Sequence, residues 1–262
     1  MANNQFLAGR KALVTGGGRG IGAAVARSLA SAGAQVTVSA RSTDQIEAVA
    51  DELRGAGHSA FAVACDVSDP DQVESLCRQA AEHMGGVDIL VNNAGIASSA
   101  PLARETLEQW NRIFAVNVTG VFLCSRALIS GMLENGWGRI VNVASVAGKM
   151  GGPYISTYTA SKHAVVGFTR AVAVEVAKKG VTVNAVCPGY VDTDMSDHTV
   201  ETITGKTGMD EAAARKVLED MSPQGRIFTS EEVAGQVLHL CAPWSDGVNG
   251  QSLVLDGGAF QA

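Results

Sequence analysis

Two side chains at helical spacing are candidates for acid–base catalysis. Tyr158 and Lys162 lie four residues apart in the segment TYTASKHAVVGFTRAV, whose apolar pattern predicts a helix. Residues at this spacing share one helix face, so both side chains should project together. A neighbouring ammonium favours a phenolate, which predicts a pKa of Tyr158 lowered toward the working pH, as a general acid or base requires. Tyr and Lys at this spacing are also common on ordinary helices, so the pair needs support from other residues.

A glycine-rich segment near the N-terminus predicts a phosphate-binding loop. Residues 15–22 have the sequence TGGGRGIG and lie between an apolar run at 11–15 and a helical pattern that begins at Ile21. Glycine allows the backbone to turn sharply and to approach a diphosphate, and a helix N-terminus offers free N–H groups to it. The spacing T-G-x-x-x-G-x-G differs from the G-x-G-x-x-G of long Rossmann dehydrogenases. A glycine-rich turn without a ligand is the alternative.

Seven short apolar runs predict the strands that position these residues. They lie at 11–15, 35–39, 60–64, 87–92, 139–144, 181–186 and 252–256, with helical spacing between them. This alternation predicts an α/β fold: a single doubly wound Rossmann-type domain over residues 1–262, with a seven-stranded parallel sheet and helices on both faces. Residues 192–223 lack a strand pattern and contain one predicted helix at 209–221. We expect a substrate lid there, with a plain surface loop as the alternative.

Composition argues against several classes of protein. The 262 residues include 20 Lys and Arg against 26 Asp and Glu, a net charge of −6, without a basic run for nucleic acid or an anionic membrane. The N-terminus lacks the pattern of a secretory signal, and no apolar run reaches the roughly 18 residues of a membrane span. Five widely spaced cysteines and five histidines without ligand spacing predict a cytoplasmic protein with reduced thiols and no metal site.

Six motifs occur in a characteristic order along the chain. They are Thr15 to Gly22, Asn92-Asn93-Ala94-Gly95, Asn117, Ser145, Tyr158-x-x-x-Lys162 and Pro188-Gly189. With them the chain resembles the short-chain dehydrogenase/reductase family over nearly its whole length. The resemblance implies an NAD(P)-dependent enzyme that interconverts a ketone and a secondary alcohol.

The resemblance also implies a role for each of four catalytic positions. Tyr158 would transfer the proton to or from the substrate oxygen, and Ser145 would hydrogen-bond that oxygen. Lys162 would hold the nicotinamide ribose and tune Tyr158. Asn117 would anchor a water that links Lys162 to solvent, although an Asn that caps or kinks a long helix is the alternative.

The cofactor positions are carried over in the same way. They are Thr15, Gly16, Gly18, Arg19, Gly20, Ile21, Gly22, Arg41, Asp66, Val67, Asn93, Ala94, Gly95, Tyr158, Lys162, Pro188, Gly189, Val191 and Thr193. Asp66 would contact the adenine, or is a plain turn acid. NAD-binding chains usually have an acid at the end of the second strand, where this chain has Arg41. Arg41 and Arg19 could close on a 2′-phosphate, so NADP(H) is expected, with NAD(H) possible if Arg41 is only solvated.

The substrate is suggested by two longer stretches. SKHAVVGFTRA and NAVCPGYVDTDM are similar to 3-oxoacyl thioester reductases, including ketoreductases of aromatic polyketide synthesis. Members that accept an acyl carrier protein typically have basic residues where this chain has Glu134, Asn135 and Val174, so a free CoA ester or a small ketone is favoured. The pocket candidates are Ser145, Ala147, Met150, Tyr154, Tyr190 and Met195.

The resemblance implies a homotetramer, with the long helix around residues 118–128 and the Tyr–Lys helix at the interface. Two alternatives of function remain open: an NAD-dependent secondary alcohol dehydrogenase working oxidatively, and a cofactor-sensing binding protein without catalysis. Proteins of the second kind usually lack Tyr or Lys of the motif, whereas this chain has all four catalytic positions.

Overall fold

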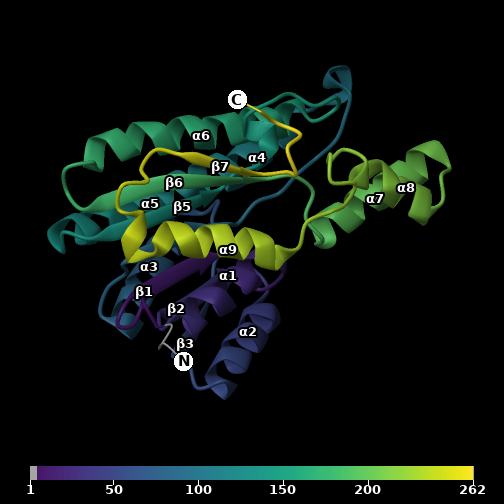
Figure 1. Ribbon diagram of the computed structural model, residues 1–262. Helices are drawn as coiled ribbons and strands as arrows, with labels where there is room; N and C mark the ends of the chain where they lie inside the picture. The colour runs from purple at the N-terminus through teal and green to yellow at the C-terminus, as the bar shows by residue number, and fades with distance from the viewer. Residues whose placement is uncertain (1–4, 262) are drawn as a thin grey trace.

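The computed structural model describes residues 5–261, in which seven parallel strands form one sheet (Figure 1). The sheet order is β3-β2-β1-β4-β5-β6-β7. The strands are β1 (Lys11–Thr15), β2 (Gln35–Ala40), β3 (Ala60–Ala64), β4 (Ile89–Asn92), β5 (Gly138–Val143), β6 (Val181–Pro188) and β7 (Ser252–Leu255). The predicted doubly wound fold is confirmed, and each predicted strand occurs with only small shifts at its ends.

Helices cover both faces of the sheet, as the period of two along a buried strand requires. In β1, Ala12 and Val14 pack against one face, formed by α1 (Gly20–Ser31), α2 (Thr43–Gly55) and α9 (Ser230–Cys241). Leu13 points to the opposite face, which is formed by α3 (Pro70–Met84), α5 (Gly120–Glu134) and α6 (Ser156–Val176). Both faces of the sheet are therefore buried.

A long irregular helix crosses the second face. α4 (Leu107–Phe114) continues through a π-helical turn at Ala115–Thr119 into α5, giving 28 residues from Leu107 to Glu134. Among the described residues this is the one helix whose length and hydropathy would allow it to cross a membrane, a test that core helices also pass. Leu123, Cys124 and Leu128 of α5 are buried against α3 and the sheet, which is the packing of a core helix.

The segment 192–223 contains two helices that project beyond the carboxyl edge of the sheet (Figure 1). α8 (Glu211–Glu219) corresponds to the predicted helix, but the expectation of a single helix is wrong, because α7 (Asp194–Thr207) precedes it. α7 has the sequence DMSDHTVETITGKT, which is poor in strong helix formers and in regular apolar spacing. It is stabilised instead by a small cluster in which Val200 packs with Ala214 and Leu218 of α8.

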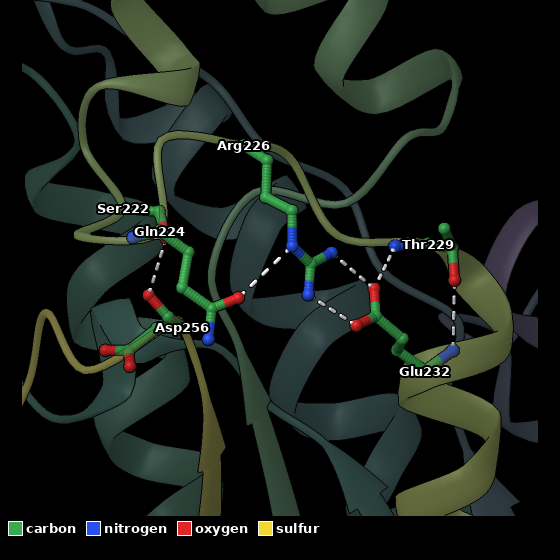
Figure 2. A network of polar contacts seen from close by, with 6 residues as sticks. All are labelled: Ser222, Gln224, Arg226, Thr229, Glu232 and Asp256. Atoms are coloured by element: carbon green, nitrogen blue, oxygen red, sulfur yellow. Dashed lines mark hydrogen bonds and ion pairs between the residues drawn. The ribbon is translucent and has the colours of Figure 1, made fainter.

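Residues 222–232, which connect this segment to α9, are fixed by polar contacts (Figure 2). Arg226 forms two hydrogen bonds to the carboxylate of Glu232, at 2.8 and 2.6 Å. Glu232 and Thr229 also form a capping box at the start of α9. Ser222 donates a hydrogen bond of 3.1 Å to the carbonyl of Asp256, just after β7. The end of the segment 192–223 is therefore anchored to both the sheet and α9.

Candidate active site

The candidate residues lie where parallel strands end at one edge of the sheet. Strand order reverses between β1 and β4, and open α/β sheets bind ligands in the crevice at such a point. The glycine-rich loop follows β1 and Asn93 follows β4. Ser145 lies two residues beyond β5, and Gly189 follows β6 directly. The topology therefore brings these distant segments to a common edge.

The glycine-rich loop is held rigidly by the segment after β4. The amide of Asn93 donates to the carbonyls of Thr15 and Gly16, both at 3.0 Å. The hydroxyl of Thr15 in turn accepts from the backbone N–H groups of Asn93 and Ala94, at 3.1 and 3.2 Å. A Cβ at Gly22 would lie only 2.1 Å from the carbonyl oxygen of Gly16, so only glycine fits there.

The start of α1 next to this loop is free to accept an anion. Arg19 is its N-cap residue and makes no side-chain cap, and the first turn contains no acidic residue. Gly18, Gly20 and Ile21 belong to the loop and the first turn of the helix. A tight glycine turn, a close backbone and an uncapped helix N-terminus fit the diphosphate of a dinucleotide.

Ser145, Tyr158 and Lys162 lie together after β5 and on α6. The Ser145 hydroxyl accepts from the N–H of Ala147 at 3.1 Å and lies close enough to the phenol of Tyr158 to lower its pKa. The Lys162 Nζ lies 5.7 Å from the centroid of the Tyr158 ring and donates to the carbonyl of Val143 at 2.9 Å. Tyr158 and Lys162 therefore share one helix face, as the spacing predicted.

The pKa of Tyr158 differs from the sequence prediction. Burial raises it to about 12 and outweighs the hydrogen bond from Ser145, which lowers it. The expected lowering by Lys162 is wrong for this structure, because the loss of hydration around the phenolate dominates. Burial also lowers the pKa of Lys162 to about 8. The phenol thus stays protonated at neutral pH, and the nearby ammonium is the more acidic of the two groups.

Asn117 is buried in the π-helical turn and connects three segments. Its side-chain oxygen accepts from the N–H of Ile96 at 2.9 Å, and its amide donates to the carbonyl of Ile96 at 2.9 Å. The same amide donates to Ser161 at 3.1 Å. A Cβ on Gly95 would lie 3.4 Å from Asn117 Oδ1 and 3.6 Å from Lys162 Nζ. Asn117 therefore lies in an irregular turn of the long helix, as the alternative for this residue requires. It also lies close to Lys162, as the role in catalysis requires.

Sequence reasoning missed a buried polar network beneath the site. The amide of Asn92 donates to Asn142 at 2.9 Å and to Ser125 at 3.2 Å. Asn142 donates to Thr169 of α6 at 2.9 Å. The network ties β4 and β5 to α5 and α6. The available signal was an asparagine in each of two otherwise apolar strands, since a buried amide needs partners.

The residues expected at the adenosine end are Asp66, Val67, Arg41 and Arg19, and each has its own contacts in this structure. Asp66 accepts from the N–H and hydroxyl of Ser68, at 3.0 and 2.6 Å, which is the geometry of a turn acid. The Ser68 hydroxyl, and more weakly the charge of Arg41, hold the pKa of Asp66 below its usual value. The neighbouring Val67 is buried. Arg41 is exposed near Asp66, whereas Arg19 forms an ion pair with Asp194 of α7. In this structure Arg19 therefore pairs with an acid of α7, and the closing of Arg19 and Arg41 on one 2′-phosphate stays a prediction.

The nicotinamide-side candidates follow β6. Pro188 ends the strand, and Gly189 donates its N–H to the carbonyl of Leu255 at 2.8 Å. The Thr193 hydroxyl donates to the carbonyl of Val191 at 3.2 Å. A Cβ on Gly20 would lie 3.0 Å from the Thr193 methyl group, so the start of the segment 192–223 lies directly against the glycine-rich loop.

The substrate candidates vary in exposure. Ala147 is buried, and the half-buried Tyr190 packs against the apolar cluster of α7 and α8. Met150, Tyr154 and Met195 are exposed apolar side chains. Among the described residues Tyr154 is the one non-glycine residue with positive φ, at 64°, and such strain often occurs at functional sites.

The part of the chain that the structure describes contains neither a cluster of metal-binding side chains nor a disulfide. Residues 5–261 contain no group of three or more His, Cys, Asp or Glu side chains placed to hold a metal ion. All five cysteines are free and buried.

Comparisons with known proteins agree with this geometry. The family model described as short chain dehydrogenase matches residues 10–204. A 3-oxoacyl-[acyl-carrier-protein] reductase from Synechocystis sp. is 41% identical, with 96% of this chain and 97% of the relative covered. A D-beta-hydroxybutyrate dehydrogenase from Rhizobium meliloti is 36% identical, with 95% and 98% covered. A crystal structure of a variant of actinorhodin polyketide ketoreductase with NADPH superposes with a TM-score of 0.92 at 40% identity, covering 95% of this chain and 97% of that one.

The chain belongs to the short-chain dehydrogenase family. It is an NAD(P)-dependent dehydrogenase or reductase with the Rossmann-type fold of that family.

Proposed function

We propose that this protein is an NADP(H)-dependent ketoreductase that acts on a 3-oxoacyl thioester or a small ketone, with Tyr158 as the general acid. The observation that carries this proposal is the group formed by Ser145, Tyr158 and Lys162 at the carboxyl edge of the sheet. The polyketide ketoreductase and 3-oxoacyl reductase among its relatives support a ketone substrate.

The bound nicotinamide would supply the hydride, so the residues of this chain have to position the ketone and deliver a proton. Ser145 donates a hydrogen bond to the ketone oxygen and holds it beside the phenol. Tyr158 gives its proton to that oxygen as the carbonyl carbon is reduced, which leaves a phenolate. Lys162, with a pKa of about 8 against about 12 for Tyr158, is acidic enough to restore the proton. Asn117 would hold the water that reloads Lys162 from solvent.

The dinucleotide would lie along the glycine-rich loop and the segments after β4 and β6. The glycine-rich loop and α1 would bind the diphosphate, Asn93 to Gly95 and Lys162 would flank the riboses, and Val191 and Thr193 would meet the carboxamide. Arg41 stands where NAD-binding chains usually have an acid, which favours a 2′-phosphate. The NADPH in the related ketoreductase structure supports the same choice.

Initial rates at 340 nm test the proposal. NADPH and NADH are each offered a short 3-oxoacyl-CoA and a cyclic ketone. We expect reduction with a clear preference for NADPH, and the faster ketone identifies the substrate class. Nucleotide binding without turnover on either ketone would favour a cofactor-sensing protein instead.

A second candidate is an NAD-dependent dehydrogenase that oxidises a secondary alcohol. The relative named as a D-beta-hydroxybutyrate dehydrogenase favours it. The pairing of Arg19 with Asp194 also favours it, because Arg41 is then left without Arg19 to bind a 2′-phosphate. Oxidation of 3-hydroxybutyrate with NAD, faster than any NADPH-dependent reduction, would establish this function.

We propose a free thioester or small ketone rather than a carrier-bound substrate. Glu134 and Val174 are exposed, and Val174 is 80% accessible, so neither offers a cation to an acidic carrier. We expect similar kcat/KM values for a CoA ester and its carrier-protein ester. Val174→Arg should raise kcat/KM for the carrier ester alone. A wild-type preference of ten-fold or more for the carrier ester would contradict this proposal.

We further propose a homotetramer located in the cytoplasm, with residues 192–223 as a lid on its single domain. Exposed apolar side chains on the long helix support the assembly, among them Phe122 and Trp110. Light scattering after gel filtration should give four times the 27.0 kDa chain mass, and Phe122→Glu should lower it. Free, buried thiols are compatible with a reducing compartment.

A further inference from the structure

The start of the lid lies against the loop that would bind the cofactor. Asp194 is the first residue of α7, and its carboxylate forms an ion pair with the guanidinium of Arg19, the N-cap residue of α1. We propose that Asp194 is a cofactor-specificity residue that competes with the 2′-phosphate of NADP(H) for Arg19. This inference rests on the proposed function, because it takes that phosphate as the ligand of Arg19.

The surroundings single out Asp194 among three neighbouring carboxylates. Arg215 of α8 holds Asp192 at 2.8 Å and lies 3.9 Å from Asp197. Asp194 pairs with Arg19 and with no other cation among residues 5–261. The three acids therefore divide between two partners, and of these acids only Asp194 forms an ion pair with the glycine-rich loop.

The ion pair is accessible to a ligand. The side chains of Arg19 and Asp194 are 61% and 62% exposed, so the pair is screened and a ligand can reach it. A phosphate monoester carries more charge than a carboxylate and binds arginine through two oxygens. NADP(H) should therefore displace Asp194 from Arg19, whereas NAD(H) lacks the 2′-phosphate and leaves the pair intact.

Two consequences follow from this competition. Asp194→Asn should tighten NADPH binding by roughly two- to five-fold, the range for an exposed ion pair, and leave NADH binding unchanged. Because such coupling is reciprocal, NADPH should also loosen the first turn of α7. Thr193 packs against Gly20, so a movement of the glycine-rich loop should also move the first turn of α7.

Fluorescence titration with NADPH and NADH tests the inference without any turnover. The proteins are the wild type, Asp194→Asn, Arg19→Gln and the double variant. The matched control is Asp197→Asn, which removes the same charge from the same helix but faces Arg215. Melting temperatures confirm that each variant is folded.

We expect the NADPH dissociation constant to fall only for Asp194→Asn, and the effect to vanish in the Arg19→Gln background. Hydrogen exchange at residues 193–198 should rise with NADPH and not with NADH. Equal effects of Asp194→Asn and Asp197→Asn, or an effect that persists without Arg19, would overturn the inference. If the wild type prefers NADH, the proposed cofactor preference fails. The inference then requires that Asp194→Asn still tightens the weak NADPH binding by roughly two- to five-fold and only in the presence of Arg19, and it fails if the NADPH dissociation constant does not change.

Discussion

The carboxylate of Glu232 should contribute measurably to stability, because it serves two groups at once. It accepts two hydrogen bonds from Arg226 and a third from the N–H of Thr229 at 2.8 Å (Figure 2). These contacts hold the pKa of Glu232 at about 2, against an ordinary 4.5, with the Arg226 hydrogen bonds as the largest cause. Substitutions at this position separate the ion pair from the helix cap.

The size of the contribution to the free energy of unfolding depends on how far the ion pair is exposed to solvent. Arg226 and Glu232 are 43% and 35% exposed, so solvent screening reduces the charge contribution to about 1 kcal/mol. Glu232→Gln keeps an oxygen for Thr229 and should cost about that much. Glu232→Ala also loses the capping box and should cost about 2 kcal/mol, or roughly 4–8 °C in Tm for a chain of this size.

Urea unfolding at pH 7 and pH 3.5 measures this contribution. Because the pKa of Glu232 is lowered on folding, its stabilisation is complete above about pH 4.5 and is lost as the pH falls toward 2. The difference between wild type and Glu232→Gln should therefore narrow at pH 3.5. Glu52→Gln is the control, since Glu52 pairs with Arg27 on the surface without capping a helix. Equal stability of wild type and Glu232→Gln at pH 7, or a difference independent of pH, would refute the reasoning.

Two further predictions concern the site itself. Because burial lowers the pKa of Lys162 to about 8, kcat/KM for reduction should fall as the pH rises through 8. Lys162→Arg should move this fall to higher pH. A wild-type kcat/KM that stays constant up to pH 9.5 would contradict this prediction. Gly22→Ala should abolish nucleotide binding, because its Cβ would lie 2.1 Å from the Gly16 carbonyl oxygen. The control Gly131→Ala should bind the nucleotide normally, because its Cβ meets no atom within 4 Å. Equal nucleotide binding by the two variants would contradict this prediction.

The strands and the site motifs were predictable from sequence for a physical reason. Strands buried on both faces are continuous apolar runs, so β1 to β7 are visible as local patterns. The glycines at 16 and 22 are required by local backbone geometry, and Tyr158 and Lys162 by helical spacing. Each of these signals lies within a few residues of its cause.

The features that could not be predicted depend on contacts between distant segments. α7 is stabilised by α8 rather than by its own sequence, and Arg19 meets an acid 175 residues away. The pKa of Tyr158 depends on how far the phenol is buried, which the four-residue spacing to Lys162 does not specify. The amides of Asn92 and Asn142 meet only because β4 and β5 pair in register.

The role of Tyr158 is tested most directly by replacing its hydroxyl. Tyr158→Phe should bind NADPH with a dissociation constant within about two-fold of wild type and lose roughly 10²- to 10⁴-fold in ketone reduction, the usual contribution of general acid catalysis. Reduction by Tyr158→Phe within ten-fold of the wild-type rate would contradict the assignment of Tyr158 as the proton donor.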